Sequence, residues 1–211
     1  HAVLMEISEL DKYGICDGIS EIILTSGIKN PNAAPIGLIR KDNRVFIRLY
    51  KGSTTYENVK QDEIFAANVT CDPLLFVKST FSNLENENFK YYPLNSTKIP
   101  LLKNSASSVI FRCGEIKHTE QAMTAEIIPM NAMANDYRPR AINRGLTAVI
   151  EAAVHATRYE LTGNSDFLDL IDRCLETTYK CGGQREKDAA EILLNEINEI
   201  KKRVAGGKDT E

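Results

Sequence analysis

The hydrophobic period changes once along this 211-residue chain, near residue 144. Before that position, apolar residues recur at every second place in short runs. Residues 45–50, for example, put Val, Ile and Leu on one face and Phe, Arg and Tyr on the other. After it, they recur three and four places apart, as in an amphipathic helix. The fold class is therefore predicted to be α+β (mainly β), with a β-rich first two-thirds and a helical last third.

Six stretches of the first part have strand character, with turn-forming residues between them. They are residues 19–27, 33–40, 45–50, 64–70, 108–118 and 121–130. The polar residues 41–44 predict the turn of one hairpin, and residues 117–120 predict the turn of another. Apolar residues on both faces of part of the first hairpin indicate a closed or covered sheet.

Two helices are expected to interrupt these strands. The hydroxyl cluster at residues 53–55 offers oxygens to the free amides of a helix N-terminus, and Asp72-Pro73 supplies an N-cap followed by a first-turn proline. Residues 82–107 hold many Asn, Ser and Lys residues, and we expect a short helix and a loop there.

Three helices are expected in the last third, at residues 144–162, 166–179 and 186–204, separated by glycines. The expected organisation has four parts. They are an N-terminal extension over residues 1–13, with residues 1–4 interpreted as a cloning remnant; a β-rich domain over 14–131; a helical subdomain over 132–204; and a flexible tail over 205–211.

Composition and charge argue against several classes of protein. The 26 Lys+Arg against 29 Asp+Glu give a net charge of −3, which disfavours a general nucleic-acid binder. The longest apolar runs span a few residues, far fewer than the roughly 20 of a membrane span. Residues 1–5 lack a basic start followed by an apolar core, so no secretory signal is expected. Five cysteines without a two-residue spacing favour reduced thiols in a cytoplasmic protein. Cys71 and Cys113 are expected in the core.

Familiar catalytic motifs are missing. The sequence has no Gly-x-Gly-x-x-Gly, Walker, His-Glu-x-x-His or Gly-x-Ser-x-Gly motif. Apart from His1, the two histidines lie on different expected elements, His118 in a solvated turn and His155 in a helix. A three-histidine metal site within one chain is therefore excluded, and no metal is expected.

Residues 48–58 are the most informative stretch. A strand ends at Lys51 and Gly52, and Ser53, Thr54 and Thr55 then begin a helix. Helix N-terminal amides and the helix dipole favour negative charge, hydroxyls donate to oxygens, and the Lys51 ammonium suits phosphate. The stretch is consistent with an anion site and equally with an ordinary N-cap beside a solvated lysine.

A second unusual stretch is a strand of small residues that contains a proline. It comprises Asn32, Ala33, Ala34, Pro35, Ile36 and Gly37. Backbone groups that large side chains do not cover can contact a flat ring. The simpler interpretation is an edge strand that the proline protects from further pairing.

A third group combines four arginines with one carboxylate and one imidazole. It comprises Arg138, Arg140, Arg144, Glu151, His155 and Arg158. The last four fall within about 60° of one another on a helical wheel, opposite the apolar face. They are substrate or subunit-interface candidates, with His155 as the candidate proton donor, although a salt-bridged surface explains them as well.

The first two stretches, with residues 65–77, resemble FMN-binding split-barrel proteins (flavin reductase-like). Within that superfamily, the chain is most similar to a largely archaeal family catalogued as a domain of unknown function, which joins a split barrel to a C-terminal helical region. Residues 138–158 resemble that second part, so the resemblance covers about residues 14–204. It implies an FMN-binding split β-barrel with a C-terminal helical subdomain.

The resemblance also implies a homodimer with FMN near the subunit interface. Its phosphate would be held by Lys51, Ser53, Thr54, Thr55 and Asn58, in place of the Lys-Asp-Thr-x-x-Asn stretch of related flavin reductases. The strand at residues 32–37 would line the isoalloxazine, and Arg48 would place a positive charge near the ring or phosphate. A flavin-dependent oxidoreductase with an unknown electron donor and small-molecule substrate is the expected function. Alternatives are an FMN carrier or sensor without catalysis, or a split barrel that binds another ligand at the phosphate site.

Overall fold

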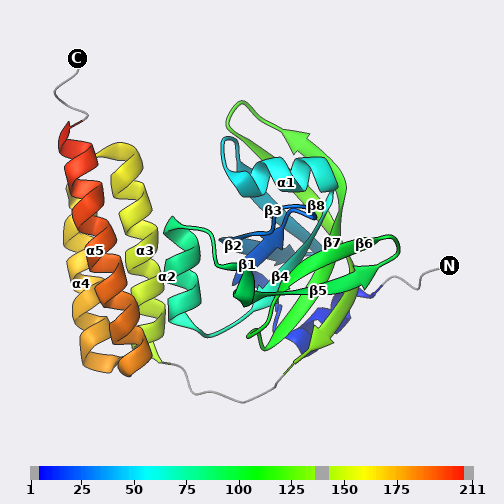
Figure 1. Ribbon diagram of the computed structural model, residues 1–211, viewed down its shortest axis with the longest axis horizontal. Coiled ribbons are helices and arrows are strands. Elements are labelled where there is room, and N and C mark those ends of the chain that lie inside the picture. Colours follow the sequence, from blue (N-terminus) through cyan, green and yellow to red (C-terminus); the bar gives the residue numbers. More distant parts are fainter. Residues whose placement is uncertain (1–4, 136–142, 207–211) are drawn as a thin grey trace. The chain divides into compact units, whose positions relative to one another are not determined.

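The computed structural model describes residues 5–135 and 143–206, which divide into two compact units (Figure 1). Of the described residues, 5–70 and 83–135 form the barrel unit, and 71–82 and 143–206 form the helical unit. The two units are described separately below.

Six antiparallel strands close the barrel. In spatial order they are β1 (Gly18–Ser26), β2 (Asn32–Lys41), β3 (Arg44–Tyr50), β8 (Ala122–Ala134), β7 (Ser107–His118) and β4 (Ile64–Val69). The predicted turn at residues 41–44 is confirmed: Asp42 and Asn43 both have positive φ, of 53° and 57°, as a two-residue hairpin turn requires. The predicted α+β (mainly β) class is also confirmed.

The barrel interior is filled by aliphatic side chains and two phenylalanines. Phe65 and Phe111 stack with ring centroids 5.9 Å apart, and helix α1 (Thr54–Asp62) adds Tyr56 and Val59 to the same core. Helix α1 therefore belongs to the barrel structurally.

Residues 7–13, expected to be part of an extension, instead form the 3₁₀ helix η1 (Ile7–Tyr13). Its Leu10 is fully buried in the barrel core, as is Ile15 just after the helix. An apolar side chain without solvent exposure stabilises the barrel by about 1.5–3 kcal/mol. This segment is therefore part of the folded unit.

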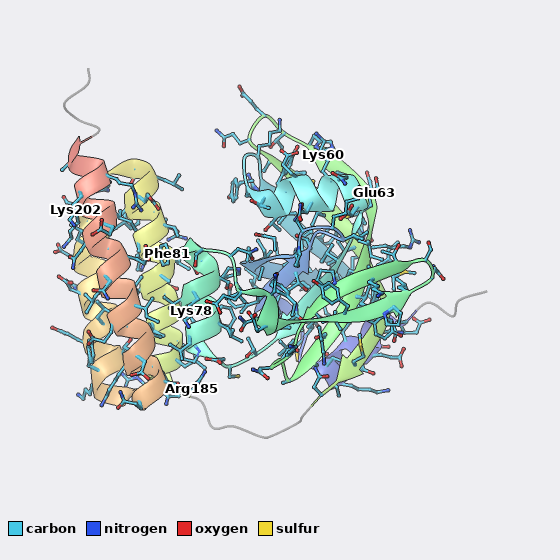
Figure 2. The ribbon with its side chains drawn as sticks, in the orientation of Figure 1. Lys60, Glu63, Lys78, Phe81, Arg185 and Lys202 are labelled. Carbon is cyan, nitrogen blue, oxygen red and sulfur yellow. The ribbon has the colours of Figure 1, made fainter. Side chains whose placement is uncertain are left out.

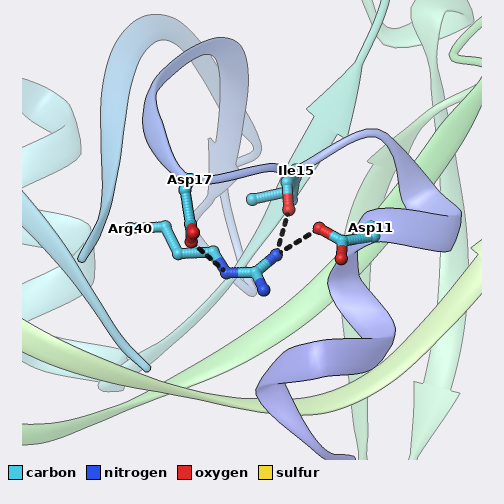
Figure 3. Close-up of polar contacts among 4 residues, drawn as sticks. All are labelled: Asp11, Ile15, Asp17 and Arg40. Carbon is cyan, nitrogen blue, oxygen red and sulfur yellow. Dashed lines mark hydrogen bonds and ion pairs between the residues drawn. The ribbon is translucent and has the colours of Figure 1, made fainter. Parts of the chain in front are cut away.

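A nearly buried arginine fastens the same segment to the barrel (Figure 3). The Arg40 side chain is 8% exposed, and its Nη1 donates to Asp11 Oδ1 at 2.6 Å and to the Ile15 carbonyl at 2.8 Å. Its Nε lies 3.1 Å from Asp17 Oδ1. A buried guanidinium needs such partners, because an unpaired buried charge is costly.

Of the short helix and the loop expected at residues 82–107, the short helix is confirmed and the loop is wrong. After the short helix η2 (Asn86–Asn88), β5 (Phe89–Leu94) and β6 (Thr97–Leu102) form a hairpin whose turn has Asn95 at a φ of 53°. Ile99 and Leu101 pack against the barrel. Many of the polar residues that obscured the alternation lie at the turn and at exposed positions.

The helical unit contains α2 (Pro73–Phe81), α3 (Arg144–Thr162), α4 (Asp166–Cys181) and α5 (Gln184–Gly206). The three C-terminal helices are confirmed, with small shifts at the ends of α4 and α5. The expected domains placed α2 in the β-rich segment, whereas it groups with the helical unit. Val77, which is fully buried, explains the difference because it belongs to the same apolar cluster as Val149 and Leu193.

The cysteines differ in exposure. Burial, and then the charge of Glu63, raises the pKa of Cys113 to about 11, as expected of a core thiol. Cys71 is exposed, so its expected place in the core is wrong: it lies just beyond the end of β4. The cytoplasmic location stays a prediction. Within residues 5–135 and 143–206, no helix has the length and apolar character that crossing a membrane would require.

Candidate functional site

Helix α1 begins with the cap that the sequence predicts. Ser53 Oγ accepts a hydrogen bond from Tyr56 N at 3.1 Å and donates one to the Tyr50 carbonyl at 3.0 Å. Both hydrogen-bonding functions of this hydroxyl are therefore used by the cap. In the first turn, the backbone N–H groups of Thr54 and Thr55 have no intrahelical acceptor.

Helix α1 has two polar flanks, because successive residues are 100° apart around a helix. Thr55, Asn58 and Asp62 lie within about 60° of one another. Tyr56 and Lys60 lie together on the other flank, and Lys60 is labelled on this helix in Figure 2.

The first flank holds the β1–β2 corner, which is the loop at residues 27–31 together with Ser26 and Asn32 beside it. Asn32 Nδ2 donates to Thr55 Oγ1 at 3.0 Å, joining two of the predicted site residues. Asp62 Oδ2 accepts from the backbone amide of Ile28 at 3.1 Å.

Asn58, another predicted site residue, contacts this corner as well: its Nδ2 lies 3.4 Å from Ser26 Oγ. The sequence analysis did not single out Ser26, Ile28 or Asp62. Their contacts join positions 32 and 34 residues apart, and no local motif marks them.

Strands β2 and β3 separate soon after their hairpin. Ile39, Arg40 and Lys41 pair with Phe46, Val45 and Arg44, and the described structure pairs no further residues of these two strands. Continuing the same register would place Gly37 opposite Arg48 and Pro35 opposite Tyr50. We call this unpaired region the β2–β3 split.

The split leaves backbone groups of β2 without a neighbouring strand. Hydrogen-bonding direction alternates along an antiparallel strand, so the groups of Ala33, Pro35 and Gly37 point the same way as those of Ile39, toward the β3 side. These three residues form the open edge of β2. Proline has no N–H, so the edge offers the Gly37 N–H and several carbonyls.

Arg48 lies on the outer face of β3 beside the split. Its guanidinium carbon is 5.4 Å from the ring centroid of Tyr50, whose side chain is 60% exposed. The structure thus places Arg48 across the split from Gly37. Among the described residues, Arg48 makes no hydrogen bond or ion pair with the β1–β2 corner.

The second flank of α1 borders a shallow cavity of about 490 Å³. Its lining residues are Lys51, Tyr56, Glu57, Lys60 and His118. The backbone amide of Lys51 donates to the Gln121 carbonyl at 3.0 Å, which holds Lys51 beside the turn between β7 and β8. Two ammonium groups against one carboxylate make this cavity favourable for an anion. Neither Lys60 nor His118 was predicted here: no local motif marks Lys60, and His118 at the end of β7 lies far away in the sequence.

The third predicted group lies in the helical unit, apart from Arg138 and Arg140, which fall outside the described residues. Glu151 Oε1 is 3.3 Å from His155 Nε2, so these two side chains do meet. The expectation that His155 lies opposite the apolar face is wrong. Its residue is 8% exposed, and its ring packs 6.0 Å from that of Phe167. Helix α3 contacts α2, α4 and α5, so a wider arc of it is buried than the wheel predicts.

The arginines of this group lie at the two ends of α3. Arg144 is its first residue and Arg158 lies near its C-terminal end, and both are exposed. The catalytic role of His155 and the binding roles of the arginines stay predictions. In the described part of the chain, no three His, Cys, Asp or Glu side chains gather to hold a metal ion.

Comparison with known proteins identifies relatives over nearly the whole chain. Residues 20–136 match a family model described as the N-terminal domain of a protein of unknown function (DUF447), and residues 143–195 match a second model of DUF447.

Two archaeal proteins are similar along most of their length. A crystal structure described as an FMN-bound DUF447 protein from Methanosarcina mazei is 44% identical, with a TM-score of 0.85, and covers 88% of this chain and 98% of its own. An uncharacterized protein of Methanocaldococcus jannaschii is 28% identical over 196 residues, 85% of this chain and 98% of its own.

Proposed function

Because this chain belongs to the DUF447 family, we propose that it binds FMN at the β2–β3 split, with the phosphate near the N-terminus of α1. The observation that carries the proposal is the open edge of β2 beside a helix N-terminus, in a chain 44% identical to an FMN-bound protein. Bound FMN would supply hydride or electron transfer.

The open edge of β2 suits the polar side of an isoalloxazine. That side of the ring carries carbonyl and ring-nitrogen acceptors together with one N–H donor. The Gly37 N–H and the carbonyls of Ala33 and Pro35 can match such a pattern. Small residues there let a flat ring approach the backbone, and a Cβ on Gly37 would already come within 3.2 Å of Ile19 Cγ2.

The N-terminus of α1 suits a phosphate. The free N–H groups of Thr54 and Thr55 and the helix dipole attract an anion there. Lys51 precedes this turn and faces the cavity that Lys60 and His118 also line. Since Thr55 Oγ1 accepts from Asn32, Thr55 also links the phosphate end to the β1–β2 corner.

The chemistry that we propose is that of a flavin-dependent oxidoreductase. The electron donor or substrate would reach the flavin from the solvent-exposed side of the β2–β3 split. Reduction of the bound flavin by NADH or NADPH, followed by turnover with an acceptor, would support an enzyme. Reduction without turnover would favour an FMN carrier or sensor. Tight binding of another phosphorylated cofactor or of heme, without FMN, would favour the remaining alternative.

We also propose a homodimer that covers the outer faces of β1–β3. Ile19 is 67% exposed and lies beside Ile39, which itself pairs with Phe46, so apolar side chains cross three strands in one row. Such a row favours association. Sedimentation is expected to give twice the 23.6 kDa chain mass, and Ile19→Glu is expected to shift the mass toward that of one chain. A monomeric wild-type protein would contradict this.

Lys51→Met tests the phosphate position. Loss of one charged contact, worth about 1.5–3 kcal/mol, is expected to weaken FMN binding by about tenfold or more. The measurement is a titration of apoprotein with FMN, in which the quenching of flavin fluorescence reports binding. Lys98→Met, which removes an exposed lysine from β6, is the matched control and is expected to leave the Kd unchanged. Equal affinities for both variants would place the phosphate elsewhere, and a wild-type protein without FMN affinity would refute the proposed function.

A further inference from the structure

The N-terminal end of the open edge of β2 is held by one side chain from elsewhere in the chain. Asn83 is the first residue after helix α2 and its C-cap. Its Oδ1 accepts from the Ala33 amide at 3.1 Å, and its Nδ2 donates to the Pro31 carbonyl at 2.8 Å. The same Oδ1 accepts from the Leu84 amide at 2.9 Å, which fixes the carboxamide plane.

These contacts reproduce those of a neighbouring strand. In a parallel pair, one residue of the adjacent strand accepts at its carbonyl from an N–H of its partner, and its own N–H donates to the partner carbonyl two residues earlier. The Asn83 carboxamide does this for Ala33 and Pro31. The Ala33 amide, expected from the sequence to face the ring, is therefore already engaged, and the groups available to a ligand begin beyond it.

The residue between these two contacts is tied to the helix. Asn32 lies between Pro31 and Ala33, and its side chain donates to Thr55 of α1. Asn83 on one side and Thr55 on the other thus fix the direction in which β2 enters the split. Small displacements at this corner would move both the open edge and the N-terminal turn of α1.

We propose that Asn83 is a positioning residue for the flavin site: it holds the Pro31–Ala33 backbone so that the open edge of β2 and the N-terminus of α1 keep the spacing that FMN needs. The inference rests on the proposed FMN site. Asn83 need not touch the cofactor, because it acts through the backbone that it holds.

The test compares Asn83→Ala, Asn83→Asp and Asn88→Ala. Alanine removes both contacts and is expected to weaken FMN binding about tenfold, the equivalent of one or two net hydrogen bonds. Aspartate keeps the acceptor for Ala33 but loses the donor to Pro31, so its affinity is expected to lie between those of alanine and wild type. Asn88 donates from Nδ2 to the nearby Glu85 carbonyl, and its replacement is expected to leave FMN binding unchanged.

Two readouts separate positioning from general stability. Hydrogen exchange of the Ala33 amide in the apoprotein is expected to be faster in Asn83→Ala and close to wild type in Asn83→Asp. Circular dichroism in the far ultraviolet first checks that every variant is folded. The visible circular dichroism of the bound flavin is then expected to change in Asn83→Ala only. Wild-type protein without FMN affinity would overturn the proposed function. Normal FMN affinity and normal Ala33 protection in Asn83→Ala would overturn the role of Asn83 alone.

Discussion

Replacing Asn68 by leucine is expected to lower the free energy of unfolding of the barrel unit by about 4 kcal/mol. Asn68 on β4 is fully buried, and its carboxamide makes four hydrogen bonds. Nδ2 donates to the Ile23 carbonyl and to Thr25 Oγ1, both at 2.9 Å. Oδ1 accepts from the Leu102 amide at 3.0 Å and from Ser108 Oγ at 2.8 Å.

The expected cost follows from the partners that leucine leaves behind. Each buried polar group without a hydrogen bond costs about 1–3 kcal/mol, and some of the four can pair again after small shifts. Leucine has at least the volume of asparagine, so no cavity adds to this cost. Thr25 Oγ1 also donates to the Pro100 carbonyl, so the same network joins β1, β4, β7 and the β5–β6 hairpin.

The measurement is denaturant unfolding followed by circular dichroism, since the chain contains no tryptophan to serve as a fluorescent probe. Asn86→Leu, at an exposed position of η2, is the control and is expected to change stability by about 0.5 kcal/mol or less. A loss below about 1 kcal/mol in Asn68→Leu would show that these four hydrogen bonds contribute little to the stability of the barrel unit.

Local patterns were sufficient to predict much of the barrel. The alternation in residues 45–50, the Asp42-Asn43 turn and the Ser53 cap each depend on a few neighbouring residues, and all three are present. The β5–β6 hairpin was missed because its polar residues weakened the alternation, while burial of Ile99 and Leu101 depends on strands far away in sequence. Helix α2 was recognised, but only tertiary packing places it with the helical unit.

The candidate site shows the same limit. Asn32, Thr55 and Asn58 could be predicted because they lie in two stretches with unusual composition, and the structure brings them to one corner. Asn83 could not, because an asparagine after a helix is ordinary and its contact with Pro31 spans 52 residues. The wheel placed His155 on the wrong face, since one helix alone does not reveal how many neighbours surround it.

Gly27→Ala is expected to weaken FMN binding by about a hundredfold or more and to destabilise the barrel by about 3 kcal/mol. Gly27 begins the β1–β2 corner with a φ of +86°, where a side chain is strained. A Cβ there would lie 2.2 Å from the Asn30 carbonyl oxygen and 2.6 Å from Asn58 Nδ2. The Asn58 side chain can rotate, but the carbonyl belongs to the backbone, so the loop itself must move.

That movement is what connects the substitution to the site. The loop from Gly27 to Pro31 carries the Ile28 amide that binds Asp62, and it leads directly into Asn32, which binds Thr55. Displacing it would shift the start of β2 relative to the N-terminus of α1, so both ends of the proposed FMN site would lose their spacing. The measurements are FMN titration of the folded apoprotein and denaturant unfolding.

Gly18→Ala separates this steric effect from the cost of the backbone conformation alone. Gly18 has a φ of +99°, and nothing lies within 4 Å of the position that a Cβ would occupy, so only the left-handed backbone penalty of about 1 kcal/mol applies. Its FMN affinity is expected to equal that of the wild type. If Gly27→Ala behaved like Gly18→Ala in both measurements, the corner would be pliable, and the geometry of the β1–β2 loop would not control the position of the open edge of β2.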